Sequence, residues 1–131
     1  MTHRSSRPMR GFFVPLLVAL AAASPAAMAL NWVPILKNSP AERFDDEDLQ
    51  LFLKTARKTV NEAPDNQTVS WENPDTKHHG DFTILKTFQK DGRTCKQLRV
   101  RNEADGRKAS SVVDACQVDG KWRLISAPQR E

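Results

Sequence analysis

Cysteine and aromatic residues are scarce in this chain of 131 residues. With only two cysteines, a metal site built from several thiolates lacks its ligands. Only seven tryptophans and phenylalanines lie beyond residue 30, so a chain of this size can bury only a modest core. A covalent cross-link would help to stabilise such a core. Nothing in the sequence resembles the nucleophile turn of a hydrolase or a calcium-binding loop.

The segment 1–29 has the composition of a secretory signal peptide. Residues 1–10 carry three arginines and no acid, residues 11–23 are almost wholly apolar, and the small-residue triplet Ala27-Met28-Ala29 follows. We expect cleavage before Leu30. The alternative is an uncleaved anchor, although prolines interrupt the run of about 20 apolar residues that a spanning helix needs. No cysteine lies near the cleavage point, so lipid attachment to a new N-terminal cysteine is not expected.

Loss of this segment removes the basic excess of the chain. Residues 1–29 hold three of the 20 basic residues and none of the 16 acidic ones, which leaves 17 against 16. A nearly balanced charge gives no support for nucleic acid as a partner. The expected product is an exported protein with no transmembrane segment, for which peripheral association with a membrane stays open.

One amphipathic helix is predicted from about residue 46 to residue 61. Its apolar face would consist of Leu49, Phe52, Leu53, Ala56 and Val60. Asp45 is a good N-cap, and the three acids that follow it lie at the positive end of the helix dipole. Residues 30–43 contain two prolines and no period, which predicts an extended lead-in. A short strand is predicted at 68–71.

Three Asp-Gly pairs, at 91–92, 105–106 and 119–120, recur every 14 residues between strand-like segments. Asp-Gly favours two-residue hairpin turns, so the pattern predicts a four-stranded antiparallel meander. In this register Cys95 lies opposite Cys116, at a site where Cα atoms approach to about 4.5 Å. We therefore predict a cross-strand disulfide, which agrees with export to an oxidising compartment. Free buried thiols and metal ligation are the alternatives.

The same register divides the apolar residues between the two faces of the sheet. One face would carry Phe82, Ile84, Phe88, Cys95, Val112, Cys116 and Ile125, and the other Leu85, Leu98, Val100, Val113, Ala115, Trp122 and Leu124. Neither face is polar, so we expect the helix to cover one and curling of the sheet to cover the other; a bulge would shift this register. The predicted fold is an α+β domain over residues 44–127, with the amphipathic helix packed on a curved antiparallel β-meander of four to five strands.

Four motifs stand out across residues 44–126: WENPDT with a following glycine, TCKQLRV, DAC and DGKWRL. Their defining residues are Trp71, Asn73, Pro74, Gly80, Cys95, Lys96, Cys116, Asp119, Gly120 and Trp122. In spacing and residue type they resemble the C-terminal domain of the rickettsial 17 kDa surface antigen and its proteobacterial relatives. The resemblance implies a non-enzymatic protein of the Gram-negative envelope, either in the periplasm or at the periphery of the outer membrane.

Two features of the full-length antigens are missing ahead of the matching region. Those proteins carry a lipoprotein cysteine and a glycine-rich, membrane-associating segment, and residues 1–43 show neither. The resemblance therefore does not imply stable anchoring in the outer membrane.

His78 and His79, with Asp75 and Asp81, form the only cluster that resembles a metal site. Adjacent side chains in an extended loop point apart, so we predict a solvated polar loop and no metal. The acids at 45–48 lack the glycine and the distal glutamate of a calcium loop, and the helix dipole explains them.

No catalytic or cofactor-binding residue is predicted. Ser110, Ser111 and Asp114 could be imagined as a nucleophilic set with a distant histidine, but serines on the solvent face of a strand are ordinary. Trp71, on the short strand, is more typical of a core residue than of a recognition residue. Asn73 is expected to fix the turn that follows.

Five basic residues make the central hairpin positive: Lys96, Arg99, Arg101, Arg107 and Lys108. They form either a patch for an anionic partner or a solvated surface in which acids interleave. The resulting hypothesis is an exported, non-enzymatic envelope protein that acts by structural or binding contacts with an envelope protein or polymer. The alternatives are a periplasmic inhibitor or binding module for an acidic partner and, less favoured, a small periplasmic metal-dependent enzyme.

Overall fold

The computed structural model describes Gly11 and residues 33–131. The predicted signal peptide, apart from Gly11, and its cleavage point lie outside the described residues. Within the described part, no helix has both the length and the apolar content to cross a membrane.

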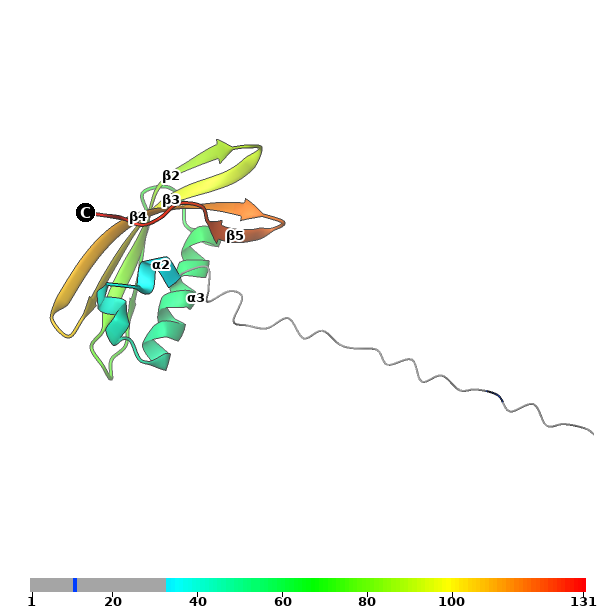
Figure 1. Ribbon diagram of the computed structural model, residues 1–131. Helices are drawn as coiled ribbons and strands as arrows, with labels where there is room; N and C mark the ends of the chain where they lie inside the picture. The colour runs from blue at the N-terminus through cyan, green and yellow to red at the C-terminus, as the bar shows by residue number, and fades with distance from the viewer. Residues whose placement is uncertain (1–10, 12–32) are drawn as a thin grey trace, which may run out of the picture.

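The chain forms one antiparallel sheet with a long helix across one face. The strands are β1 (Thr68–Glu72), β2 (His79–Lys90), β3 (Arg93–Ala104), β4 (Arg107–Val118), β5 (Lys121–Leu124) and β6 (Gln129–Arg130). Their order is β1-β2-β3-β4-β5, and β6 also pairs with β4. The curved sheet wraps around helix α3 (Asp46–Glu62), and the short helices α2 (Val33–Leu36) and η1 (Pro40–Arg43) lie on the same side (Figure 1). The predicted α+β class is confirmed.

Each of the three predicted hairpin turns is present. Asp105 and Gly106 have φ values of 51° and 77°, and the Asp-Gly pairs at 91–92 and 119–120 match them closely. Positive φ at both central residues is the geometry for which Asp-Gly is favoured, and it suits the twist of the flanking strands. The Asp-Gly spacing therefore sets the order and length of β2 to β5.

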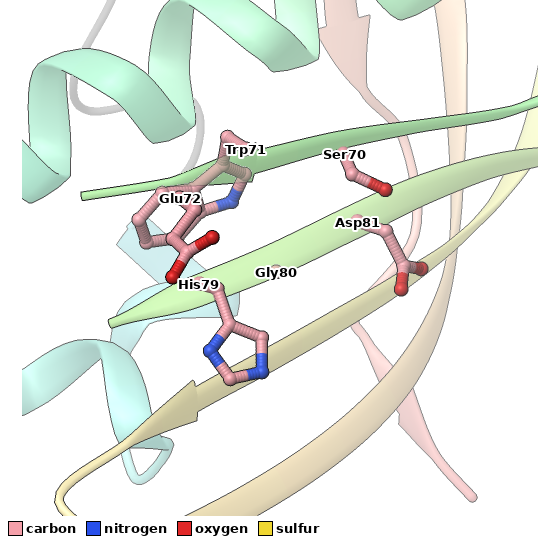
Figure 2. Close-up of a pocket in the computed structure, with 6 residues that line it drawn as sticks. All are labelled: Ser70, Trp71, Glu72, His79, Gly80 and Asp81. Carbon is pink, nitrogen blue, oxygen red and sulfur yellow. The ribbon is translucent and has the colours of Figure 1, made fainter. Parts of the chain in front are cut away.

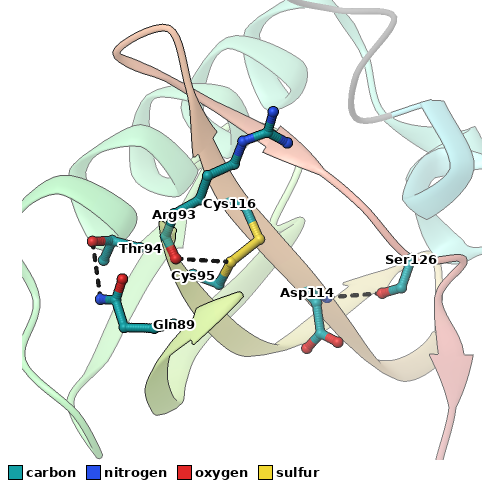
Figure 3. Close-up of a disulfide and its surroundings, with 7 residues drawn as sticks. All are labelled: Gln89, Arg93, Thr94, Cys95, Asp114, Cys116 and Ser126. Carbon is teal, nitrogen blue, oxygen red and sulfur yellow. Dashed lines mark hydrogen bonds between the residues drawn. A yellow bond between two sulfur atoms is a disulfide. The ribbon is translucent and has the colours of Figure 1, made fainter. Parts of the chain in front are cut away.

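The disulfide is present between β3 and β4, at the predicted positions (Figure 3). Cys95 pairs with Cys116 in the ladder, and their Cα atoms are 4.0 Å apart. That separation is slightly shorter than the distance of about 4.5 Å between the close pairs of an antiparallel ladder. Both cysteines are buried, so the cross-link is shielded from solvent.

The predicted division of side chains between the two faces was wrong for β2. A bulge between Ile84 and Lys86 shifts the register, so that Phe82 pairs with Val100 and Ile84 with Leu98. A one-residue shift reverses which face each side chain occupies. Phe82 and Ile84 consequently lie on the helix side, here called the inner face.

One core fills the space between helix α3 and the inner face. Its buried members include Phe52, Ala56, Val60, Trp71, Phe82, Ile84, Leu98, Val100, Val113 and Ala115. The opposite, outer face was expected to be apolar and covered, and this was also wrong. It is mostly polar, with His79, Asp81, Thr83, Arg99, Arg101, Glu103, Lys108, Ser110 and Asp114. The sheet therefore needs a helix on one side only.

Helix α3 matches its prediction, whereas the lead-in does not. Asp45 caps the helix and forms a capping box with Asp48. The extended lead-in expected over 30–43 is replaced, from Val33 onward, by α2 and η1. Ile35 and Ala41 are buried there, so tertiary packing stabilises turns that the sequence pattern did not reveal.

Candidate functional site

A buried polar cluster lies where the start of α3 meets the loop between β1 and β2. At its centre is Asp48, whose side chain has no solvent-exposed area. Asn73 Nδ2 and Thr76 Oγ1 donate hydrogen bonds to Asp48 Oδ1 over 2.8 and 2.7 Å. The backbone N–H of Asp45 donates to Oδ2 over 3.0 Å. The buried carboxylate is thus saturated with donors from two segments of the chain.

His78 connects this carboxylate to the turn between β3 and β4. Its Nδ1 lies 2.7 Å from Asp48 Oδ2, and its Nε2 lies 2.9 Å from Asp105 Oδ1. The residue is only 7% exposed, and its ring stacks on Phe44 with centroids 6.1 Å apart. Because a carboxylate oxygen faces each ring nitrogen, both nitrogens must carry hydrogen, which is the charged form of imidazole.

The hydrogen bonds set the protonation states of both groups. Burial raises the pKa of the Asp48 carboxyl, but bonds from Asp45, Thr76, His78 and Asn73 outweigh burial and lower it from 3.8 to about 2. The bond to Asp105 raises the pKa of His78 above 6.5; burial opposes this rise, and Asp48 adds to it. The cluster is therefore an ion pair within the fold, with a second, more exposed carboxylate at its edge.

An acid–histidine–acid line resembles a catalytic relay, but this one has no free base. A general base must present an unprotonated nitrogen to substrate, and neither nitrogen of His78 is available. The cluster instead ties together three segments that are distant in sequence: the start of α3, the Asn73–His78 loop and the β3–β4 turn. The predicted solvated loop is therefore wrong for His78. His79 is exposed, and its Nε2 lies 2.9 Å from Glu103 Oε2.

Trp71 and Gly80, from the WENPDT motif and the glycine that follows it, pack beside this cluster. Trp71 is buried, as expected, and meets the ring of Phe44 edge-on at 5.1 Å. Gly80 pairs with Trp71 across β1 and β2. A Cβ atom on Gly80 would lie closer than 3.0 Å to Trp71 Nε1 and to the backbone oxygen of Arg101. Glycine is thus required there by close packing.

The loop after β1 is shaped by Asn73, as its sequence position indicated. The side-chain oxygen of Asn73 accepts a hydrogen bond from the backbone N–H of Asp75 over 3.0 Å, across Pro74. The Asn73 backbone N–H donates to the His78 carbonyl oxygen, and the Lys77 N–H donates to the Asn73 carbonyl oxygen. The side-chain amide of Asn73 therefore stabilises the turn through its oxygen and the Asp48 cluster through its nitrogen.

The last motif, DGKWRL, contacts the C-terminal end of α3. Asp119 and Gly120 form the β4–β5 turn, and the Trp122 indole N–H donates to Asn61 Oδ1 over 3.1 Å. Lys96 Nζ donates to the Val60 carbonyl oxygen over 2.8 Å and lies 5.5 Å from the centre of a Trp122 ring. A cation at the negative end of a helix stabilises it.

The five basic residues of the predicted patch do not form one surface. Lys96 lies on the inner face against α3, and Arg99 is bound by Glu131. Arg101, Arg107 and Lys108 are exposed. Lys108 Nζ is 3.9 Å from Glu103 Oε2. An anionic partner would thus meet three cations with acids among them, not five cations together.

Two shallow depressions flank β2 near Gly80. One, of about 400 Å³, is lined by Ser70, Trp71, Glu72, His79, Gly80 and Asp81. Figure 2 shows Asp81 of β2 beside Ser70 of β1, and His79 farther along β2, near Glu72. The other, of about 350 Å³, reaches across the outer face to Arg101, Ser110 and Glu131. Ser110 Oγ donates to Glu131 Oε2 over 2.8 Å and not to a histidine. The imagined nucleophilic set is therefore not assembled, since neighbouring Ser111 faces the opposite side of β4.

Among residues 33–131 and Gly11, no group of three or more histidine, cysteine or acidic side chains could hold a metal ion. The sequence did not identify Asp48 or Asp105 as site residues. The sequence pattern could have indicated that Asp48 is buried. It lies four residues before Phe52 and eight before Ala56, on the apolar stripe of the helix. An acid on such a stripe indicates a buried partner.

Comparisons with known proteins agree with the motif resemblance. Residues 58–123 match the family described as 17 kDa outer membrane surface antigen. The 17 kDa surface antigen of Rickettsia prowazekii is 29% identical over 84 residues, which cover 63% of this chain and 53% of that protein. The corresponding antigens of Rickettsia conorii and Rickettsia bellii are 29% and 28% identical over 85 residues.

The chain thus spans about half the length of the curated relatives it matches. No solved structure matches it. The matched segment runs from the second half of α3 to β5, and so contains the first motif, both cysteines and the closing Asp-Gly turn. On this evidence the chain belongs to the 17 kDa outer membrane surface antigen family.

Proposed function

We propose that this chain is an exported protein of the Gram-negative envelope that acts through contacts with other envelope components and not by catalysis. The observation that carries the non-catalytic part is the state of His78. It is the buried histidine beside a carboxylate, yet both of its nitrogens are bonded to acids. The His78 ring therefore stabilises the fold and presents no unprotonated nitrogen to a substrate. The neighbouring His79 pairs with Glu103 at the surface.

Three features support export to the envelope. The family consists of outer membrane surface antigens. The Cys95–Cys116 disulfide is typical of oxidising compartments and rare in the cytosol. Residues 1–29 have the composition of a secretory signal. We place the mature protein in the periplasm or at the periphery of the outer membrane.

Fractionation combined with intact-mass measurement tests the location. The full chain, expressed in a Gram-negative host, should be recovered from the periplasmic or outer-membrane fraction with Leu30 as its first residue. Its mass should fall short of the reduced mass by two hydrogens, and the Cys95→Ser, Cys116→Ser chain should show no such difference. Recovery from the cytoplasm with Met1 and free thiols would contradict the proposal.

Complementation of a deletion strain tests the non-catalytic part. Any envelope defect of that strain, such as detergent sensitivity, should be restored by His79→Gln and Ser111→Ala chains as fully as by the unchanged chain. Immunoblots of the envelope fraction would confirm equal amounts. Loss of complementation by either variant at unchanged abundance would favour the alternative of a small periplasmic enzyme.

A second candidate function is the binding of an anionic envelope protein or polymer. It is favoured by the exposure of Arg101, Arg107 and Lys108 around the β3–β4 turn. Affinity capture from solubilised envelope should recover the partner with the unchanged chain and lose it when all three are changed to glutamine. A matched control changes three exposed cations of α3 instead: Lys54, Arg57 and Lys58. Equal recovery by both triple variants would contradict this function.

A further inference from the structure

Half of strand β4 forms an edge of the sheet that only a short segment covers. Strand β5 pairs with Ala115–Val118, and β6 pairs only with Ser111 and Val112. The backbone N–H of Glu131 extends this pairing by one bond, to the Ser110 carbonyl oxygen at 3.0 Å. Among the described residues, no strand pairs with 107–109 on this side. Figure 1 shows the C-terminal segment running beside β4.

A carboxylate-binding site lies directly beside this edge. Arg99 Nε and Nη2 donate to the two side-chain oxygens of Glu131 over 2.7 and 3.0 Å. Ser110 Oγ donates to the same carboxylate over 2.8 Å. The two-pronged arginine bond, followed by the serine bond, lowers the pKa of Glu131 to about 2. This pairing is the standard geometry by which arginine recognises carboxylates.

We propose that the β4 edge from Arg107 to Val112 is a docking site for an extended acidic peptide segment of an envelope partner, and that Gln129–Glu131 occupies it in the partner's absence. The incoming segment would pair with β4 as an added strand and place a carboxylate on Arg99 and Ser110. Added strands obtain affinity from backbone hydrogen bonds and specificity from alternate side chains. This inference deepens the proposed contact function and rests on it.

The register specifies where acids are needed in the partner. Arg130 lies opposite Ser111, so Glu131 lies opposite Ser110 on the outer face. Side chains alternate along a strand, so the outer-facing position that follows would lie opposite Lys108, which is exposed. The preferred sequence is therefore an acid, any residue and a second acid.

The opposite edge of the sheet, at β1, with which no second strand of the described residues pairs, does not suit the same partner. Strand β1 presents Thr68, Ser70 and Glu72 on the outer face, none of which is basic. The resident segment at β4, by contrast, is exposed and short. Besides its pairing with β4 and the bonds of Glu131, one hydrogen bond joins it to another of the described residues, from Arg130 Nη2 to the Asn38 carbonyl oxygen at 2.7 Å. Segments with so few buried contacts open most readily.

Peptide titration followed by amide NMR tests the proposal on the purified, oxidised chain carrying Glu131→Gln, which weakens the resident contact. The probe is the peptide Ser-Ala-Pro-Gln-Arg-Glu-Ala-Glu, whose first six residues copy residues 126–131. The comparison peptide has glutamine in place of both glutamates. The acidic probe, added up to about 5 mM, should shift the amides of Ala109–Val112 and bind roughly tenfold more tightly than the comparison peptide.

Two further variants separate the site from general charge attraction. Arg99→Gln should reduce probe binding to that of the comparison peptide, whereas Arg123→Gln, which removes an exposed cation from β5, should leave it unchanged. If Arg99→Gln disturbs the amide spectrum, Ser110→Ala provides the same test with a smaller loss.

Absence of shifts on β4, or equal binding of the two peptides, would overturn the docking site. Either result would leave the fractionation and complementation outcomes unaffected. Failure of this inference is thus distinguishable from failure of the proposed function.

Discussion

The two ends of helix α3 are fixed to the sheet by different chemistry. At its N-terminal end, Asp48 and His78 form a buried ionic cluster that reaches the β3–β4 turn. At its C-terminal end, Lys96 binds the last carbonyl groups, and the neighbouring residue, Cys95, forms the disulfide. The first end depends on charge and protonation. The second depends on the hydrogen bonds of Lys96 and Trp122, beside a strand pair that the disulfide closes on the outer face of the sheet.

This difference has a consequence for how the domain responds to its surroundings. A buried ion pair is stable only while both partners keep their charge and their remaining hydrogen bonds. A disulfide acts mainly by restricting the unfolded chain and is insensitive to pH in the same range. Acid, alkali and reductant should therefore destabilise the domain by separate routes.

The largest expected effect comes from removing the charge of Asp48. Asp48→Asn keeps the size of the side chain but leaves a buried, charged His78 without its partner. We expect the free energy of unfolding to fall by about 3–5 kcal/mol, measured by urea denaturation. Asp46→Asn, in the exposed first turn, should cost about 0.5 kcal/mol through the helix dipole alone. Equal effects of the two changes would mean that the cluster does not stabilise the N-terminal end.

Loss of the disulfide, which closes the β3–β4 pair near the C-terminal end of α3, should have the next largest effect. Replacement of Cys95 and Cys116 by serine opens a loop with a sequence separation of 21 and should cost about 3 kcal/mol. Reduction of the unchanged chain should cost a similar amount. Cys95 and Asp105 are about 30 Å apart along β3, so the loss should add to that of Asp48→Asn within about 0.5 kcal/mol. A large departure from additivity would show that the two ends are not independent.

Two glycines allow the energetic cost of a steric contact to be compared with the cost of a positive φ. Gly80→Ala inserts a methyl group against Trp71 and Arg101 and should destabilise the fold by about 1–3 kcal/mol. Gly92→Ala has open space around it but φ of +74°, which should cost about 1 kcal/mol. Thermal unfolding of both variants measures the difference. A smaller loss for Gly80→Ala would contradict the close contact at Trp71.

The His78 cluster should also make the stability of the domain depend on pH on the alkaline side. The pKa of His78 is raised in the folded protein, so its contribution is complete below the unfolded pKa of about 6.5 and is lost as pH rises through the folded value. His78→Gln should therefore flatten the pH dependence of unfolding above pH 6.5. An unchanged slope in His78→Gln would indicate that His78 is not charged in the fold.

The acid response has the opposite sign and reports on Asp48. Its pKa falls from 3.8 to about 2 on folding, so this stabilisation is present above 3.8 and is lost as pH falls through about 2. The shift corresponds to roughly 2 kcal/mol. Asp48→Asn should remove that part of the acid dependence of unfolding.

Features encoded by local signals could be predicted from the sequence. Asp-Gly turns determine their own backbone geometry, and equal spacing of Cys95 and Cys116 about Asp105-Gly106 placed the thiols opposite each other. The capping residue Asp45 similarly marked the start of α3. In each case the deciding interactions lie within a few residues or a single hairpin.

Features decided by tertiary contact could not be predicted in the same way. The bulge after Ile84 places Phe82 and Ile84 over the helix, which a strict two-residue period cannot represent. His78 appeared to be a loop residue because its partners, Asp48 and Asp105, are 30 and 27 residues away. The basic residues were counted together in sequence although Lys96 and Arg99 lie on opposite faces.

The protonation of His78 tests the central claim, that its ring serves the fold and not catalysis. Long-range nitrogen–proton NMR of the oxidised chain at pH 6.5 would observe both ring nitrogens. We predict two protonated nitrogens, with N–H protons protected from exchange with solvent by Asp48 and Asp105. A neutral ring, with hydrogen on one nitrogen only, would contradict this assignment and make His78 a candidate general base.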